Sequence, residues 1–134
     1  MRKSTATPPS ARPGVYLLAL FLFLSSAAAS ALPKGDCKTP QPETDLRHCS
    51  FSEQKLPRID LHGADLSKVD FSNAKMADCN LRGAILVNST FKWADLTGCD
   101  LSGANLRGAD LFHAHMDTTT LTNSDLREAS LSGV

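Results

Sequence analysis

The 134-residue sequence lacks an excess of charge of either sign, because 14 basic side chains balance 14 acidic ones. Proteins that bind nucleic acid need a basic stripe that displaces counterions from phosphate, and no such stripe is visible along the chain. A basic amphipathic helix, which would attach the protein to a membrane surface, is also missing. The composition therefore argues against nucleic acid and lipid as partners.

Catalytic motifs are missing as well. The sequence contains no nucleophile elbow, no HExxH zinc motif and no glycine-rich loop of the kind that cradles phosphate. Serine, histidine and aspartate are numerous enough to write down a nominal triad, but no motif accompanies them. We therefore expect a protein that is not an enzyme and that needs no cofactor.

Long apolar runs are scarce too. The run from Val15 to Leu24 is too short to cross a bilayer. Basic residues precede it and Ala29, Ser30 and Ala31 follow it, which is the layout of a secretory signal peptide. We predict a signal peptide over residues 1–31, cleaved after Ala31, with an uncleaved signal anchor as the alternative.

Removal of this leader would change the net charge. Three of the 14 basic side chains lie in it, so the mature chain would carry 11 basic and 14 acidic side chains, a net charge of −3. The expected destination is the periplasm or the outside of the cell, without membrane contact after cleavage. The thylakoid lumen is an alternative destination.

What the sequence does contain is a repeat of five residues. Large apolar side chains occupy every fifth position from Leu46 to Leu131, and small or compact ones mostly occupy the positions two residues earlier. A period of five fits neither a helix nor a flat strand, so the chain must turn at each repeat. Four units would make a square coil of twenty residues, joined to the next coil by parallel ladder bonds. The polar exceptions at the small positions are Gln54, Ser89, Thr119 and Ser124.

The square coil predicts that unusual inward residues recur every twenty positions, where they would stack. Three sets of residues do recur at twenty or at forty, so each set would fall into one column of a four-sided coil. Stacked rings would add about 0.5 to 1.5 kcal/mol per pair beyond the burial of their area. The three sets are Phe51, Phe71 and Phe91; Cys79 and Cys99; and Met76 and Met116.

The individual units resemble the A(D/N)LxG consensus of pentapeptide-repeat proteins. The resemblance is close over residues 59–133 and loose over 46–58. It implies an all-β fold, a right-handed quadrilateral parallel β-helix of about four coils over residues 46–134, and it says little about function. The units that carry it are Ala64 Asp65 Leu66 Ser67, Ala94 Asp95 Leu96 Thr97 Gly98, Ala104 Asn105 Leu106 Arg107 Gly108 and Ala109 Asp110 Leu111.

Residues 32–45 form a proline-rich segment before the repeats, and we expect this lead-in to cap the first coil. In an exported chain, Cys37 and Cys49 are the natural pair for a disulfide that ties the lead-in to this coil, and two free thiols are the alternative. Cys79 and Cys99 would stack inside the coils. They are interpreted either as two small buried hydrophobic residues or as a second disulfide.

Outward positions carry the candidate interaction site. In the square coil, Lys92 and Trp93 lie beside Phe112 and His113 on one edge, and exposed aromatic side chains concentrate at interaction surfaces. Apolar side chains also replace the usual polar ones at two outward positions nearby. We predict an exported scaffold that binds a protein partner here or serves a structural role. The candidate residues are Trp93, Phe112, Lys92, His113, Ile85 and Val87.

Two further hypotheses concern a metal and a second copy of the chain. His113, His115 and Asp95 carry groups that can hold zinc or copper, but their pattern is weak, and no metal site is predicted. Leu126 and Leu131 stay in phase in the last coil, which predicts either a homodimer through this coil or a frayed coil.

Two other functions are weaker alternatives. The family resemblance suggests a DNA-mimicking protein that interacts with gyrase, against which the signal peptide and the mild charge both argue. An envelope protein that binds metal is the other alternative.

Overall fold

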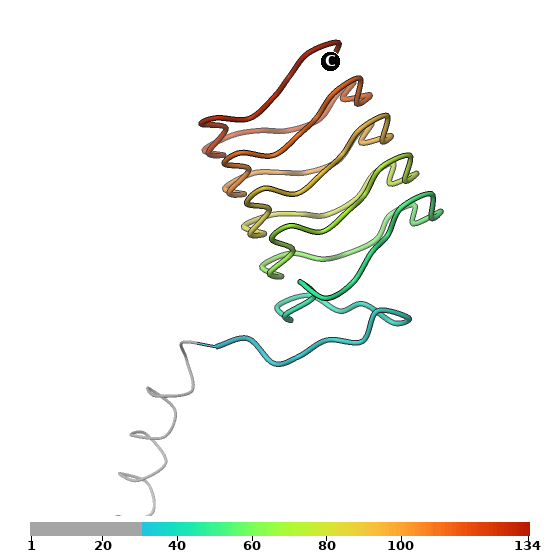
Figure 1. Ribbon diagram of the computed structural model, residues 1–134, viewed down its shortest axis with the longest axis vertical. Coiled ribbons are helices and arrows are strands. Elements are labelled where there is room, and N and C mark those ends of the chain that lie inside the picture. Colours follow the sequence, from blue (N-terminus) through green and yellow to red (C-terminus); the bar gives the residue numbers. More distant parts are fainter. Residues whose placement is uncertain (1–30) are drawn as a thin grey trace, which may run out of the picture. The chain divides into compact units, whose positions relative to one another are not determined.

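A computed structural model of the chain describes residues 31–134. Residues 1–30 of the predicted signal peptide lie outside the described residues, so that prediction stays untested. Figure 1 shows the described chain winding in stacked coils of similar size. In this part of the chain the β structure consists of isolated parallel bridges, without helices or extended strands. Within residues 31–134, no helix has the length and apolar character needed to span a membrane.

The bridges confirm the predicted quadrilateral parallel β-helix. From Asp45 onward, every bridge joins residues that are twenty positions apart. Four complete coils cover residues 46–65, 66–85, 86–105 and 106–125, and a partial coil follows over 126–134. The bridging residues fall into four columns, which define four faces. Face 1 carries Asp45, Asp65, Ile85, Asn105 and Asp125; face 2 carries Ser50, Asp70, Thr90, Asp110 and Ser130; face 3 carries Lys55, Lys75, Asp95 and His115; face 4 carries Asp60, Asn80, Asp100 and Thr120.

A complete five-residue unit in the middle coils contains one turn and backbone hydrogen bonds to the next coil. In the unit that begins at Phe71, the Ala74 N–H donates to the Phe71 carbonyl at 3.0 Å and closes a β-turn. The Phe71 N–H donates in turn to the carbonyl of Thr90 in the next coil at 2.7 Å. The third residue of the turn has a positive φ, which is 60° at Asn73. This regular alternation of a turn and a link produces the period of five.

Aspartate and asparagine close these turns from the outside. The Oδ1 atom of Asp70 accepts the Ser72 N–H at 2.8 Å, and Asp100 accepts the Ser102 N–H at 2.9 Å. A short polar side chain that bonds the backbone two residues on is favoured at turns. The same bond is made by Asp45, Asp60, Asp65, Asp70, Asn80, Asp95, Asp100, Asn105, Asp110 and Asp125.

The interior is filled by the two inward positions of each unit. Phe51 stacks on Phe71 with ring centroids 5.3 Å apart, and Phe71 stacks on Phe91 at 4.8 Å, as the spacing of twenty predicted. The polar exceptions find backbone partners: Ser89 is buried, and its hydroxyl donates to the Leu86 carbonyl at 2.7 Å. Within the described residues, every buried side-chain polar atom has a hydrogen-bond partner.

The lead-in covers part of the first coil. Asp45 donates its N–H to the Pro33 carbonyl at 2.8 Å and accepts from the Gly35 N–H at 3.0 Å, and Leu46 beside it is fully buried. A disulfide joins Cys37 to Cys49, whose Cα atoms lie 5.5 Å apart. At the opposite end of the solenoid, Leu131 is 45% exposed. The predicted inward register therefore holds throughout, but its burial is complete only in the middle coils.

A second disulfide ties two middle coils together. Cys79 and Cys99 are stacked inward, with Cα atoms 4.5 Å apart and both side chains buried. The structure therefore favours a bridge over the interpretation of these residues as two buried thiols. All four cysteines of the chain are paired.

Candidate partner-binding site

Three aromatic side chains meet at the corner between face 2 and face 3. Trp93 and His113 are stacked with ring centroids 4.3 Å apart, and the Phe112 ring packs edge-on against both. The repeat brings them together, because the Trp93 N–H donates to the Phe112 carbonyl in the next coil at 3.0 Å. We call Trp93, Phe112 and His113 the aromatic corner. The structure thus unites three of the six residues that the sequence singled out.

The aromatic corner is exposed and supported from one side. Trp93 is 52% exposed and Phe112 is 37% exposed. One coil further on, Gly133 has a φ of +77°, and a side chain there would collide with the His113 ring. Glycine therefore leaves room for the imidazole, which in turn supports one side of the indole. The corner presents apolar rings in a fixed orientation.

Lys92 lies at the rim of the aromatic corner. Its ammonium group lies 3.2 Å from the Asp110 carboxylate on face 2, and both side chains are partly exposed. A surface ion pair of this kind contributes little to stability. Lys92 therefore adds a neutralised polar edge to the corner.

An open hollow of about 370 Å³ adjoins the aromatic corner on face 3. Trp93, Lys75 and Asp95 are among the residues that line it. Asp95 accepts the Thr97 N–H at 3.1 Å, and hydrogen bonds from the Thr97 side chain and backbone lower the pKa of this carboxyl. The hollow is lined by Asn73, Ala74, Lys75, Trp93, Asp95, Thr97 and His115.

Ile85 and Val87 lie elsewhere on the surface. Ile85 bridges to Asp65 and Asn105 on face 1, and Val87 lies at the corner between face 1 and face 2. That corner is one whole face away from Trp93. The structure therefore separates these two residues from the aromatic corner, although the sequence spacing had suggested a common side.

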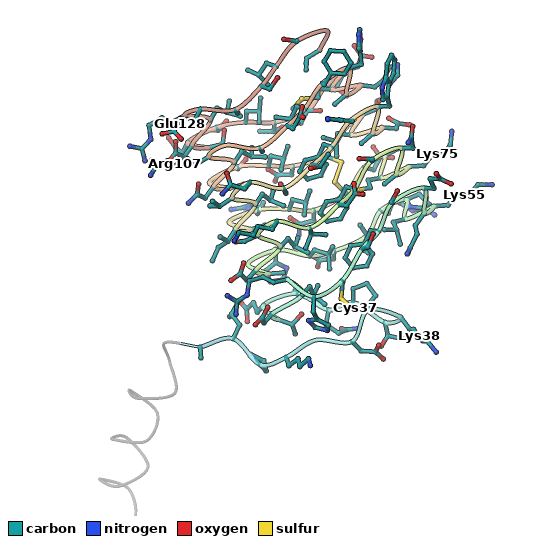
Figure 2. The ribbon with its side chains drawn as sticks, viewed as in Figure 1. Cys37, Lys38, Lys55, Lys75, Arg107 and Glu128 are labelled. Carbon is teal, nitrogen blue, oxygen red and sulfur yellow. A yellow bond between two sulfur atoms is a disulfide. The ribbon has the colours of Figure 1, made fainter. Side chains whose placement is uncertain are left out.

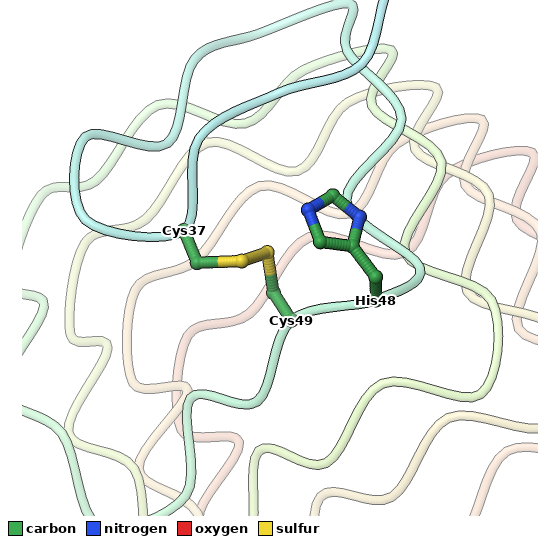
Figure 3. A group of neighbouring side chains, drawn as sticks. All are labelled: Cys37, His48 and Cys49. Carbon is green, nitrogen blue, oxygen red and sulfur yellow. A yellow bond between two sulfur atoms is a disulfide. The ribbon is translucent and has the colours of Figure 1, made fainter.

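The weak candidate metal ligands His113, His115 and Asp95 do not form a group of converging donor atoms in the described structure. Among the described residues, the group of three donor atoms that all lie within 4.8 Å of one another belongs to Cys37, His48 and Cys49 (Figure 3). Sequence reasoning overlooked His48, although it directly precedes a cysteine. The two sulfur atoms are bonded to each other, so they are not thiolates that could hold a metal.

The last coil offers a further exposed apolar surface. Leu121 and Leu126 are only partly buried, and Leu131 is exposed. The structure contains a single chain, so the homodimer expected through this coil stays a prediction.

Comparisons with known proteins agree with this geometry. The family model for pentapeptide repeats matches residues 44–83, 65–103, 74–112 and 104–134. A pentapeptide repeat protein from the Arabidopsis thaliana thylakoid lumen is 38% identical, with a TM-score of 0.59, over 62% of this chain and 61% of that protein. A search of curated proteins found no match.

Two other solved structures are more distant. HetL, a pentapeptide repeat protein involved in heterocyst differentiation regulation from the cyanobacterium Nostoc, is 31% identical over 66% of this chain and 47% of HetL, with a TM-score of 0.43. A trypsin-treated form of QnrB1, a plasmid-mediated fluoroquinolone resistance protein, is 24% identical over 63% of this chain and 46% of QnrB1, with a TM-score of 0.35. The match thus spans about three fifths of the thylakoid protein and about half of the other two. The coil geometry and the family match together establish that this chain belongs to the pentapeptide-repeat family.

Proposed function

We propose that this chain is an exported, non-catalytic interaction module that binds a protein partner through the aromatic corner. The observation that carries the proposal is the exposed cluster of Trp93, Phe112 and His113, held in place by ring stacking. Tryptophan is enriched among the residues that dominate protein–protein binding energy. A rigid solenoid presents such rings with little loss of conformational entropy on binding.

The turn geometry adds support for a role in binding. Trp93 has a φ of 60° and His113 a φ of 53°. Glycine and asparagine adopt this left-handed region more readily than bulky residues do. At the same corner, the corresponding positions of the other coils carry Glu53, Asn73 and Gly133. Large rings at this position give the turn no advantage, so we attribute them to what they contact outside the chain.

Export is the second part of the proposal. Disulfides persist in oxidising compartments, and this small chain contains two of them. The predicted leader over residues 1–31 and the relative from a thylakoid lumen support export to a compartment of this kind. The periplasm, the outside of the cell and the lumen all satisfy the redox requirement.

Affinity capture tests the binding site. The bait is the wild-type chain, the double variant Trp93→Ala with Phe112→Ala, or the control double variant Ile85→Ala with Val87→Ala, each exposed to extract of the compartment in which the protein resides. We expect the first variant to lose a partner that the wild type and the control retain. Identical partner sets for all three baits would exclude the aromatic corner. Circular dichroism confirms that each bait is folded.

Cell fractionation tests the export. We expect a processed chain with oxidised cysteines in the exported fraction, which mass spectrometry after thiol alkylation would detect. An unprocessed chain in the cytosol would instead favour the alternative of a protein that interacts with gyrase.

A further inference from the structure

Face 3 has the fewest turn-closing side chains: one of its four bridging positions, against two of five on face 2, four of five on face 1 and three of four on face 4. Nine of the ten aspartate and asparagine side chains that close turns lie on faces 1, 2 and 4, whereas face 3 has only Asp95. Lys75 makes no such hydrogen bond to the Ala77 N–H, which lies two residues further on. At Lys55 the following Pro57 has no N–H to offer, so a carboxylate would gain nothing there. A residue that ignores the local rule without a local gain indicates function.

The two lysines are stacked neighbours, and Lys75 is stacked in turn on Asp95, whose pKa the charge of Lys75 helps to lower. Lys55 bridges to Lys75, so their side chains leave adjacent rungs of the same face. Figure 2 shows both lysines projecting from one edge, on the opposite side from Arg107 and Glu128. Within the described residues, neither lysine lies within ion-pair distance of a carboxylate, whereas Arg107 pairs with Glu128 at 2.8 Å. Like charges placed directly opposite each other in a ladder destabilise it.

The hollow on face 3 joins these cations to the aromatic corner. Trp93 and Lys75 line the same hollow, and Lys55 lies one coil below Lys75. The carboxylate in the hollow, Asp95, accepts the Thr97 N–H and lies on the rung next to Lys75. A peptide that places an apolar side chain on Trp93 would therefore pass close to two ammonium groups and one carboxylate.

We propose that the partner bound at the aromatic corner contributes an acidic peptide segment, with an apolar side chain against Trp93 and carboxylates against Lys75 and Lys55. This inference rests on the proposed function and specifies its partner. Charge complementarity carries the choice of occupant, since opposite charges across an interface raise the association rate and set specificity. A peptide also fits better than an anionic bilayer, because a broad anionic surface would meet Asp95 and Asp110 as well as the lysines.

Fluorescence anisotropy with the full chain provides the test. The probes are a labelled glutamate-rich peptide that ends in phenylalanine and the same peptide with lysine in place of glutamate. We expect the acidic peptide to bind at least about tenfold more tightly, and its affinity to fall as salt is added. Combining Lys55→Gln with Lys75→Asn should weaken this binding about tenfold and reduce its salt dependence. The control, Lys68→Asn, removes an exposed charge at another corner and should leave binding unchanged.

Protein stability separates binding from folding in this test. Asparagine at position 75 can accept the Ala77 N–H, as Asn80 accepts the Arg82 N–H at 3.2 Å. The variant Lys75→Asn should therefore melt at the same or a higher temperature while it binds the acidic peptide less well. Weaker binding in a protein of undiminished stability cannot be attributed to unfolding.

Different results would overturn the two proposals separately. Suppose that Trp93→Ala with Phe112→Ala abolishes partner capture but the lysine variants bind as the wild type does. The proposal of an acidic segment is then wrong, and the proposed function stands. If all variants keep the partner, both are wrong. Binding to phosphatidylglycerol vesicles without binding to the acidic peptide would replace the peptide by a lipid surface and overturn the inference.

Discussion

The buried columns of this solenoid are nearly uniform, whereas its outer columns differ from face to face. Every inward position from Leu61 to Leu111 is buried, and Ser89 is the one polar residue among them. Outside, turn-closing aspartate and asparagine lie mainly on faces 1, 2 and 4, face 3 carries two lysines that form no ion pair among the described residues, and one corner carries aromatic rings. Close packing constrains every inward residue in the same way, whereas solvent places few demands on the outward ones. The interior thus identifies the fold, and departures on the exterior identify candidate sites.

The largest expected effect is the contrast between an inward and an outward position in the same turn. Leu101 is fully buried, whereas Ser102 is partly exposed. We expect Leu101→Asp to cost about 4 kcal/mol or more of unfolding free energy, because it buries a charge without a partner. Ser102→Asp should cost about 1 kcal/mol or less. Urea denaturation measures both, and equal losses would contradict the register.

The two disulfides extend this comparison to the cross-links. Each closes a short loop, so replacing either pair by alanine should cost about 3 kcal/mol. Cys79→Ala with Cys99→Ala removes a link between middle coils and should lower the stability of the whole solenoid. Cys37→Ala with Cys49→Ala should instead release the lead-in first. Limited proteolysis that cuts residues 32–45 equally fast in both variants would contradict this distinction.

Single outer positions should have smaller effects that differ in sign between faces. Asp70→Ala on face 2 removes the hydrogen bond to the Ser72 N–H and should cost about 1 kcal/mol. Lys75→Asn on face 3 adds a bond of the same kind and should stabilise the protein by less than that. Thermal unfolding followed by circular dichroism measures both changes. Destabilisation by Lys75→Asn would show that the lysine itself supports the coil.

The sequence predicts the interior far better than it predicts the site. The spacing of Phe51, Phe71 and Phe91 was enough to predict their stacking, because a period of twenty leaves one arrangement that aligns them. Trp93 and Phe112 were placed together by the same argument. Ile85 was misplaced, because the sequence shows that it is outward but the face follows only from counting corners.

Two other features of the surface could be recognised only from three-dimensional contacts. The proximity of His48 to the first disulfide depends on the path of the lead-in, which has no repeat to constrain it. The significance of Lys55 and Lys75 became clear only when the turn-closing bonds on the other faces were known. Periodicity predicts positions along a column, but it does not predict which side chains lack a partner.

The smallest expected effect concerns pH and again separates the faces. Hydrogen bonds from the Ser102 side chain and backbone lower the pKa of Asp100, and those from Arg127 lower the pKa of Asp125 from 3.8 to about 2. A carboxyl with a lowered pKa stabilises the folded state above the unfolded pKa, and this contribution is lost as the pH falls from about 4 toward 2. Asp100→Asn with Asp125→Asn keeps the oxygen acceptors but removes the titration. We therefore expect the melting temperature of this variant to fall less between pH 5 and pH 2 than that of the wild type. Lys68→Asn serves as the control and should leave the acid dependence unchanged, since it replaces no acidic group and Lys68 is not among the charges that lower the pKa of Asp100 or Asp125. An equal acid dependence in all three proteins would mean that these turn-closing bonds do not depend on ionisation.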